Sequence, residues 1–405
     1  MPLNPALKDG PCGACAGHRA LESITVKIPF HRPYISEEEI SEVVDTLRSG
    51  WLTTGPKTLR FEEEFARYIP ARHAVAVNSG TASLHLALKA IRLRPGDEVI
   101  VPTLTFPATG EVVSYFGAKP VLVDVDREIH NIELAAIENA ITSKTKAIIP
   151  VHYGGQPCDM DEIMQLARRH HLSVVEDAAH AIPSRYKGRG IGSIGDLTCF
   201  SFYVTKPLAT GEGGMTTTEN DEWAESMRML RLHGISQDAW KRDSKVGSWY
   251  YEVNEPGIKC NMADLEASLG IAQLKKVDGL WEKRKEIARK YTEAFRSVKA
   301  IIPPTVKPDR ETSWHLYVIK LHLEALATDR NSLIEKLRER GIETSVHFIP
   351  LHRHSYYKNT FGVMPGDFPN AEWLYERILS LPIFPGMTDR HVDYVIEQVS
   401  DLCTG

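Results

Sequence analysis

Short apolar runs alternate with helical patterns along most of this 405-residue chain, and no other feature constrains the fold more. Runs of this length that are apolar throughout are typical of strands buried on both faces of a sheet. Because helical connections join most of them, they predict a mostly parallel sheet covered by helices on both faces. Strands are expected at 73–77, 98–102, 120–124, 146–151, 173–176, 197–203 and 215–218, and helices at 37–49, 57–68, 82–91, 108–116, 132–141 and 160–170.

The length of the chain predicts two or three domains. Residues 1–26 are rich in Gly, Pro and Ala without periodicity, and we expect a mobile tail there. A large α/β domain is expected over 27–278 and a smaller α+β domain over 279–405. The remaining expectations are an irregular excursion at 234–255, helices at 262–276, 279–298 and 329–340, strands at 314–321 and 343–348, and terminal helices that begin near 370 and 388.

Charge and composition exclude several classes of protein. The net charge is −5, which argues against binding to nucleic acid or to a membrane surface as the main role. No apolar run reaches transmembrane length, and the N-terminus lacks the pattern of a signal peptide. The six cysteines are scattered, which indicates a reducing cytoplasm rather than a disulfide framework.

The tail holds one possible metal motif. Cys12, Cys15 and His18 could supply three zinc ligands. No fourth ligand follows at the spacing of a zinc finger, so we predict no metal site.

A lysine stands between the last two expected strands of the large domain. Lys206 precedes Pro207, which restricts the lysine backbone to extended conformations and removes a backbone donor. Glycines at 211, 213 and 214 permit another group to approach the backbone closely. A lysine in such a confined apolar setting has a lowered pKa, and its neutral amine can form a Schiff base with a carbonyl group. A β-hairpin with an exposed lysine at its tip is the alternative.

A turn of small residues follows the expected strand 73–77 and enters a helix at Asn78–Ser83. Free backbone N–H groups and the positive end of the helix dipole make such a turn a phosphate cradle. Plain N-capping by Ser79 or Thr81 is the alternative. Parallel sheets bind ligands at the carboxyl ends of their strands, which is where this turn lies.

Two more groups follow strands at the same edge. Phe106 places an aromatic ring above the rim, unless it is simply a core residue. Asp177, with His180 three residues later, ends another strand. Its carboxylate could hold a proton on a heteroaromatic nitrogen, or it could cap a helix or pair with Arg185.

An imine-forming lysine, a phosphate cradle, a stacking ring and a carboxylate for a pyridine nitrogen are what pyridoxal phosphate (PLP) requires. The chain resembles the DegT-type nucleotide-sugar aminotransferases, a branch of the fold-type I PLP enzymes, from about Ile28 to its end. The resemblance implies a large domain with a mostly parallel seven-stranded sheet and a smaller α+β domain. The motifs that carry it are GWLTTGP, NSGTASLHLAL, PTLTFPAT, VEDAAHA, FSFYVTKPLATGEGGM, RLHGI, VHFIPLHRHSYY and LPIFPGMTD.

The resemblance also implies a role for each matching residue. Lys206 forms the imine with the cofactor and later moves the proton, and Asp177 pairs with the pyridinium nitrogen. Phe106 stacks on the ring, and His180 lies near its phenolic oxygen. The residues expected to hold the phosphate are Gly80, Thr81 and Ser201.

An asparagine from a second subunit also reaches the phosphate in this family. Asn261 is the matching residue here, although many family members have Asn and Arg where this chain has Lys259 and Asn261. A shared site of this kind implies a homodimer. The Lys259/Asn261 variant resembles the subgroup that makes 4-amino-4-deoxy-arabinose on a UDP carrier.

The expected reaction moves an amino group from glutamate to a nucleotide-linked keto-sugar, at position 4, in amino-sugar or surface-polysaccharide synthesis. Thr54, Gly55 and His347 are candidates for contact with the sugar or nucleotide, and a packed strand histidine is the alternative for His347. Amination at position 3, a PLP-dependent sugar dehydratase and a non-catalytic regulatory paralogue are the rival functions. Related dehydratases carry histidine in place of Lys206, so the lysine favours transamination.

Overall fold

The computed structural model describes residues 27–235, 251–326 and 328–404. The prediction of a mobile tail, its Cys12, Cys15 and His18, and most of the predicted excursion at 234–255 lie outside these residues. Within the described ranges, no three His, Cys, Asp or Glu side chains are arranged to hold a metal ion. None of the helices in those ranges is long and apolar enough to cross a membrane.

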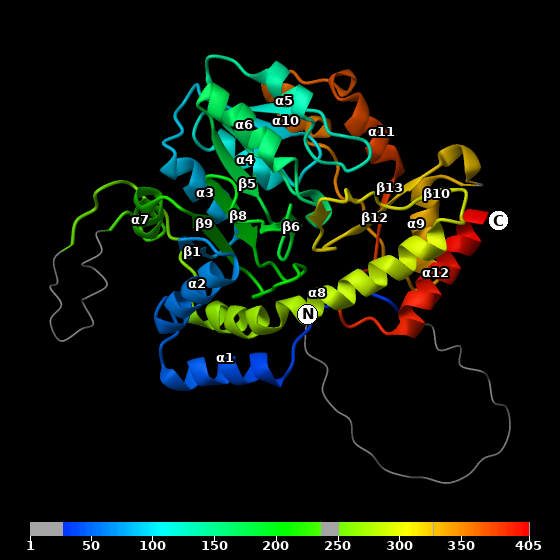
Figure 1. Cartoon of the computed structure of the whole chain (residues 1–405), viewed down its shortest axis with the longest axis horizontal. Helices are drawn as coiled ribbons and strands as arrows, with labels where there is room; N and C mark the ends of the chain where they lie inside the picture. Colours follow the sequence, from blue (N-terminus) through cyan, green and yellow to red (C-terminus); the bar gives the residue numbers. More distant parts are fainter. Residues whose placement is uncertain (1–26, 236–250, 327, 405) are drawn as a thin grey trace, which may run out of the picture.

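A seven-stranded sheet forms the centre of the larger part of the molecule, in the order β1-β9-β8-β5-β4-β2-β3 (Figure 1). All neighbouring pairs from β3 to β8 are parallel, and only β9 runs antiparallel to β8 and β1. The predicted, mostly parallel sheet is therefore confirmed. Its strands are β1 (His73–Val77), β2 (Glu98–Pro102), β3 (Lys119–Val123), β4 (Thr145–Ile148), β5 (Ser173–Asp177), β8 (Leu197–Ser201) and β9 (Gly214–Thr218).

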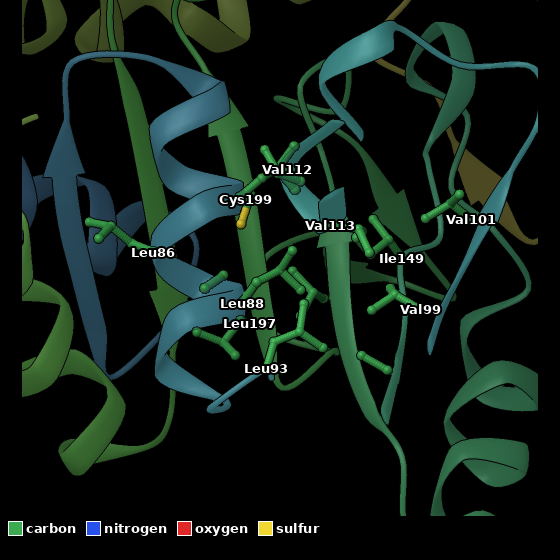
Figure 2. Packing of buried hydrophobic residues seen from close by; sticks show 14 of the residues in the cluster. Leu86, Leu88, Leu93, Val99, Val101, Val112, Val113, Ile149, Leu197 and Cys199 are labelled. Carbon is green, nitrogen blue, oxygen red and sulfur yellow. The ribbon is translucent and has the colours of Figure 1, made fainter. Parts of the chain in front are cut away.

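Helices cover both faces of this sheet, as expected for strands that are buried on two sides. On one face the core contains α3 (Gly80–Ala90), α4 (Pro107–Ser114) and α7 (Asp221–Leu230). Figure 2 shows Leu86, Val112 and Leu197 among the apolar side chains of this core. On the other face lie α2 (Pro56–Tyr68), α5 (Leu134–Ala140), α6 (Met160–His170) and the first half of α8 (Asp264–Phe295).

The long helix α8 corrects one prediction. Two helices, 262–276 and 279–298, were expected, but a single helix of 32 residues runs without interruption from Asp264 to Phe295. Glycine inside a helix costs only about 1 kcal/mol relative to alanine, so Gly279 does not suffice to end it. Val277, Leu280 and Trp281 are buried around the expected break, and their packing holds the helix together.

The C-terminal part is built on an antiparallel sheet, β10-β12-β13, with helices beside it. Its strands are β10 (Ile301–Ile302), β12 (Tyr317–Leu321) and β13 (Ile378–Leu381), and its helices are α9 (Arg330–Glu339), α10 (Ser355–Phe361), α11 (Pro369–Arg377) and α12 (Asp389–Thr404). Smaller elements complete the fold: α1 (Glu37–Ser49), β6 (Arg185–Tyr186), β7 (Arg189–Gly190) and β11 (Arg310–Glu311).

The strand expected at 343–348 is absent from this part of the structure. Ser345 alone in that segment pairs with β13, through two backbone hydrogen bonds with Ser380 of 3.2 and 2.8 Å. Beyond it the chain turns away from the sheet and carries His347 and Phe348 to a cavity. β13 itself was not predicted, because its four residues directly follow a helix and read as part of it.

We propose that the two expected domains meet near 278/279, inside α8. Ile271 and Leu274 in the first half of the helix pack in the core under the large sheet, whereas Ile287 and Tyr291 in the second half pack in a separate core. Ile28 joins this second core, and its N–H donates to the Gly341 carbonyl at 2.7 Å. The first described residues therefore pack with the smaller part.

Candidate active site

A cavity of about 420 Å³ opens at the carboxyl edge of the parallel strands. The ends of β1, β2, β5 and β8 bring residues from distant parts of the sequence to its walls. The predicted site residues that line it are Gly80, Thr81, Phe106, Asp177, His180, Ser201, Lys206 and His347.

The turn between β1 and α3 forms one end of the cavity. Ser79 caps α3, because its Oγ accepts from the Ala82 N–H at 3.1 Å. The predicted N-capping is therefore present, and it leaves the preceding N–H groups of Gly80 and Thr81 at the helix start, where no intrahelical acceptor exists. Ser201 at the end of β8 lies so close that a Cβ on Gly80 would sit 2.8 Å from the Ser201 Cβ. This close approach of N–H groups and a hydroxyl suits an anion such as phosphate.

We therefore expect Gly80→Ala to lower the affinity of the apoprotein for PLP by about 10- to 100-fold, because the added methyl group forces the cradle apart. Titration of the apoprotein with PLP, followed by absorbance, measures the change. Gly279→Ala is the matched control, since a Cβ at Gly279 meets nothing within 4 Å. Equal PLP affinity in both variants would contradict a phosphate site at this turn.

Asp177 ends β5 and points into the cavity from the buried edge of the sheet. Its Oδ2 accepts from the Thr109 hydroxyl at 2.8 Å, and its Oδ1 accepts from the Ala179 N–H at 3.1 Å. Burial raises the pKa of Asp177, while these hydrogen bonds and the Lys206 charge act in the opposite direction. A buried carboxylate of this kind favours a cationic partner, such as a protonated heteroaromatic nitrogen.

Lys206 follows β8 in a turn fixed by its own N–H, which donates to the Tyr203 carbonyl at 2.8 Å. Burial lowers the pKa of the Lys206 amine to about 8, and Asp177 acts against this shift. Lys206 lines the cavity, so the alternative of an exposed lysine at the tip of a hairpin is not what the structure shows. A substantial neutral fraction near pH 8 makes Lys206 an effective nucleophile toward a carbonyl group.

His180 lies beside Asp177 with a defined tautomer. Its Nδ1 accepts from the Gly154 N–H at 3.2 Å, so the ring hydrogen of the neutral form is on Nε2. Burial, followed by the charge of Lys206, lowers the pKa of His180 well below its usual value. His180 is therefore a neutral hydrogen-bond donor.

Aromatic rings form the mouth of the cavity. Phe106 precedes α4, and its ring is 56% exposed, with the Phe348 ring centroid 5.9 Å away. The exposed ring can stack on a planar ligand. Phe106 is therefore not a core residue, which was the alternative. His347 is oriented by Ser380, with 2.8 Å between its Nδ1 and the Ser380 Oγ, and its ring stacks on Phe30.

Thr54, Gly55 and Asn261 lie outside the cavity in the described chain. The Asn261 amide donates to the Thr54 hydroxyl, and the Gly55 N–H donates to the Asp264 carboxylate at 2.8 Å. Asp264 also accepts from Thr58, so it caps α2 and joins the loop to the start of α8. These three predicted residues thus form one cluster that does not contact Lys206 in the same chain.

Several residues of the site were not predicted from the sequence. Thr109 lies within a predicted helix. Its position one helical turn after Thr105, which follows a strand, was the one signal for a hydrogen-bonding role at the site. His315 was read as part of a strand, and His31 lay in a segment without a pattern. These histidines reach the cavity through long-range packing, which the local sequence does not record.

Comparison with known proteins agrees with this geometry. Residues 33–400 match the DegT/DnrJ/EryC1/StrS aminotransferase family. The chain belongs to this family. It is 55% identical over 375 residues to the uncharacterized protein MJ1066 of Methanocaldococcus jannaschii, covering 93% of this chain and 97% of that protein.

Two further relatives have more informative names. The spore coat polysaccharide biosynthesis protein SpsC of Bacillus subtilis is 52% identical over 379 residues, covering 93% of this chain and 97% of SpsC. The PLP-form of the putative sugar aminotransferase Spr1654 from Streptococcus pneumoniae is 37% identical, with a TM-score of 0.87, covering 93% of this chain and 99% of Spr1654. The predicted fold type, the aminotransferase activity and PLP as the cofactor of this family are thereby confirmed.

The residues of the DegT-family chain fit PLP. The close approach of Gly80 to Ser201 suits the phosphate, Lys206 is a cavity lysine with a lowered pKa, and Asp177 lines the same cavity from the end of β5. When bound, PLP supplies an electron-withdrawing ring that stabilises negative charge on a carbon that has lost its proton.

Proposed function

We propose that this enzyme transfers the amino group of glutamate to the 4-keto position of a nucleotide-linked sugar, in the synthesis of amino sugars for surface polysaccharides. The observation that carries the proposal is a cavity lysine and a buried carboxylate beside the start of helix α3, in a chain of an aminotransferase family. The name of SpsC supports the link to polysaccharides. We place the reaction in the cytoplasm, because the four described cysteines are buried free thiols.

Each residue of the site has a defined task in this proposal. Lys206 would hold the cofactor through its amine and would move the proton at the reacting carbon. The carboxylate of Asp177, held by Thr109, would keep the pyridine nitrogen protonated. His180 would offer its Nε2 hydrogen to the phenolic oxygen, and Phe106 would stack on the ring. Gly80, Thr81 and Ser201 bind the phosphate.

We also propose that Asn261 completes the phosphate site of a second subunit in a homodimer, with Thr54, Gly55 and Lys259 beside it. The contact of Asn261 with Thr54 makes these residues one unit. None of them lines the cavity of their own chain, as expected of a group that serves a partner. In the same unit the Lys259 amine donates to the Asn261 side chain and orients it.

A shared site makes a specific prediction for mixed variants. Lys206→Ala and Asn261→Ala are each expected to be nearly inactive alone. When refolded or coexpressed together, half of the dimers are mixed, and one of their two sites has both native residues. About a quarter of the native activity is therefore expected. No recovery on mixing would contradict the shared site.

The lowered pKa of Lys206 predicts how the apoprotein takes up PLP. Because the neutral amine is the nucleophile, the rate of covalent attachment is expected to rise with pH and to level off above about 8. A lysine with the ordinary pKa of about 10.4 would show a rate that still rises at pH 10. Stopped-flow absorbance across pH 6 to 10.5 distinguishes the two profiles.

The rival functions make different demands on the site. A dehydratase of this family would carry histidine in place of Lys206, and a non-catalytic paralogue has no need of both Lys206 and Asp177. Both residues are present in the cavity. Amination at position 3 is the second candidate, and it differs from the first only in the substrate.

The direct experiment has two stages. Purified holoenzyme is first mixed with glutamate, and absorbance should show conversion of the cofactor to its amine form. Keto-sugar nucleotides with UDP, GDP or dTDP carriers and the keto group at position 3 or 4 are then added. We expect return of the original spectrum and an amino sugar only with a 4-keto substrate. Conversion of none of these sugars would overturn the proposal.

A further inference from the structure

The side chain of Asp177 is directed by two hydrogen bonds from the described residues. Its backbone is fixed on both sides, because its N–H donates to the Pro150 carbonyl at 2.9 Å and its carbonyl accepts from the His152 N–H at 3.1 Å. The carboxylate then accepts from the Ala179 N–H at Oδ1 and from the Thr109 hydroxyl at Oδ2. Thr109 is thus the one side chain in the described ranges that donates a hydrogen bond to this carboxylate.

The basic side chains near Asp177 do not replace this hydroxyl. Burial raises the pKa of Asp177, and the Thr109 hydrogen bond opposes burial more than the charges of Lys206 and His152 do. The Nε2 of His152 is already engaged, since it lies 2.8 Å from Oε2 of Glu176. The hydroxyl of Thr109 is therefore the main group that favours the ionised form of Asp177.

A second threonine fixes the direction of the Thr109 hydroxyl. The Oγ1 atoms of Thr105 and Thr109 lie 2.8 Å apart, and both residues are buried. Each hydroxyl has a single hydrogen to donate. Thr109 gives its hydrogen to the ionised Asp177, which can only accept, so the Thr105 hydroxyl must donate to Thr109. The hydrogen bonds thus run from Thr105 through Thr109 to Asp177, and each polarises the next.

The first turn of α4 carries both Thr109 and the ring of Phe106. Phe106 is the N-cap of this helix, and its carbonyl accepts from the Thr109 N–H at 3.2 Å. Pro107 occupies the first helical position, where its fixed φ stiffens the turn. Phe106 and Asp177 both line the cavity. One stiff turn therefore sets the carboxylate of Asp177 relative to the exposed aromatic ring.

We propose that Thr109, with Thr105 behind it, is a positioning residue that keeps the Asp177 carboxylate ionised and directed at the pyridine nitrogen of PLP. Only the ionised carboxylate gains from this hydrogen bond, so without the hydroxyl the shared proton would move from the nitrogen toward the carboxylate. Thr109 is not among the described residues that line the cavity, and it acts through Asp177. The inference rests on the role proposed above for Asp177.

Nuclear magnetic resonance of holoenzyme with ¹⁵N in the PLP ring tests this without any substrate, because the chemical shift of the ring nitrogen reports its protonation. In Thr109→Val the ratio of protonated to unprotonated nitrogen is expected to fall by about 10- to 100-fold, the effect of losing a hydrogen bond to a charged group. Thr109→Ser, which keeps the hydroxyl, should restore most of the ratio. An unchanged ¹⁵N shift in Thr109→Val would overturn the proposal.

Thr198→Val is the matched control. Thr198 is also a buried threonine, and its hydroxyl donates to the Glu176 carboxylate at 2.6 Å, but neither residue lines the cavity. This variant should lose stability and keep the native ¹⁵N shift. A change as large as that in Thr109→Val would mean that packing alone is measured, and would refute the role of Thr109. If the valine variant does not fold, Thr109→Ala removes the same hydroxyl without adding a contact.

The conversion of the cofactor by glutamate shows whether Thr109 acts through Asp177. Thr109→Val should slow the conversion by about tenfold or more, with little change in the glutamate concentration that gives half the maximal rate. Combined with Asp177→Asn it should add less than about a further twofold, because the carboxylate on which it acts is gone. Losses that multiply in the double variant would overturn the proposal.

Thr105→Val tests the order of the two threonines. It removes the donor to Thr109 and leaves the hydrogen bond from Thr109 to Asp177, so it should change the ¹⁵N shift less than Thr109→Val does. A larger change would overturn the assigned order. If the nitrogen is unprotonated in the native holoenzyme, the role proposed for Asp177 fails and that of Thr109 with it. A nitrogen that is equally protonated in native and Thr109→Val protein refutes only the role of Thr109.

Discussion

Replacing Lys206 by alanine is expected to abolish turnover, with a loss of at least about 10⁴-fold, while the protein stays folded. The variant loses both the covalent attachment of PLP and the base that moves the proton. No other lysine of the described residues lines the cavity, so none of them can replace the Lys206 amine. Steady-state assays with glutamate and the accepted keto-sugar measure the loss.

The fold should tolerate this change because the amine is not a stabilising group at neutral pH. Its folded-state pKa of about 8 lies below the unfolded value, so protonation favours the unfolded chain below pH 8, and this penalty disappears above the unfolded pKa. Thermal unfolding at pH 7 should therefore show a Tm that is unchanged or higher. A collapse of the Tm would mean that the activity loss reports on folding alone.

Lys320 provides the matched control. It is also a buried lysine with a pKa lowered by burial, but its amine donates to the carbonyls of Arg127 and Glu128, outside the cavity. Lys320→Met should retain the mechanism, even if it unfolds at a lower temperature. Measurable turnover in Lys206→Ala, at more than about one hundredth of the native rate, would remove Lys206 from its assigned role.

Asp177→Asn is expected to retain PLP and to lose about 10²- to 10³-fold in rate. The amide has the same size and can still accept from Thr109, but it lacks the negative charge that keeps the pyridine nitrogen protonated. The loss should appear in kcat more than in KM, because the charge acts on the reacting state. The absorbance of the bound cofactor should also change, which a mere packing defect would not produce.

Asp196→Asn is the control for this substitution. Asp196 is partly buried and its pKa is raised by burial, as is that of Asp177. It accepts from the Val174 N–H at 2.8 Å at the opposite end of the same strands. This variant should lower stability and leave the cofactor spectrum unchanged. Native kinetics in Asp177→Asn would refute the role of the carboxylate.

The sequence indicated the parallel sheet well, because buried strands such as β2 and β5 are short and apolar while their connections have helical periodicity. Lys206, Asp177 and Gly80 could be predicted because each follows a strand at the carboxyl edge. The carboxyl ends of parallel strands share one edge of the sheet, so the fold brings these residues together. Such residues can be predicted from the local sequence alone.

Other parts of the site depend on packing between distant segments. His315 and His31 line the cavity although they come from segments far apart in the sequence. β13 was not predicted because it has only four residues, directly after a helix, and so short a segment shows no strand periodicity. The role of Thr54 could not be judged, since its partner Asn261 lies more than 200 positions along the chain.

The uninterrupted α8 has a mechanical consequence. In Figure 1 helix α8 passes beneath the large sheet and continues along α12, so both parts of the molecule pack against this one helix. A hinge motion between the two parts would have to break main-chain hydrogen bonds of α8 near Val277 to Trp281, where buried side chains pack around the helix. We therefore expect the cavity to keep its shape when a substrate binds.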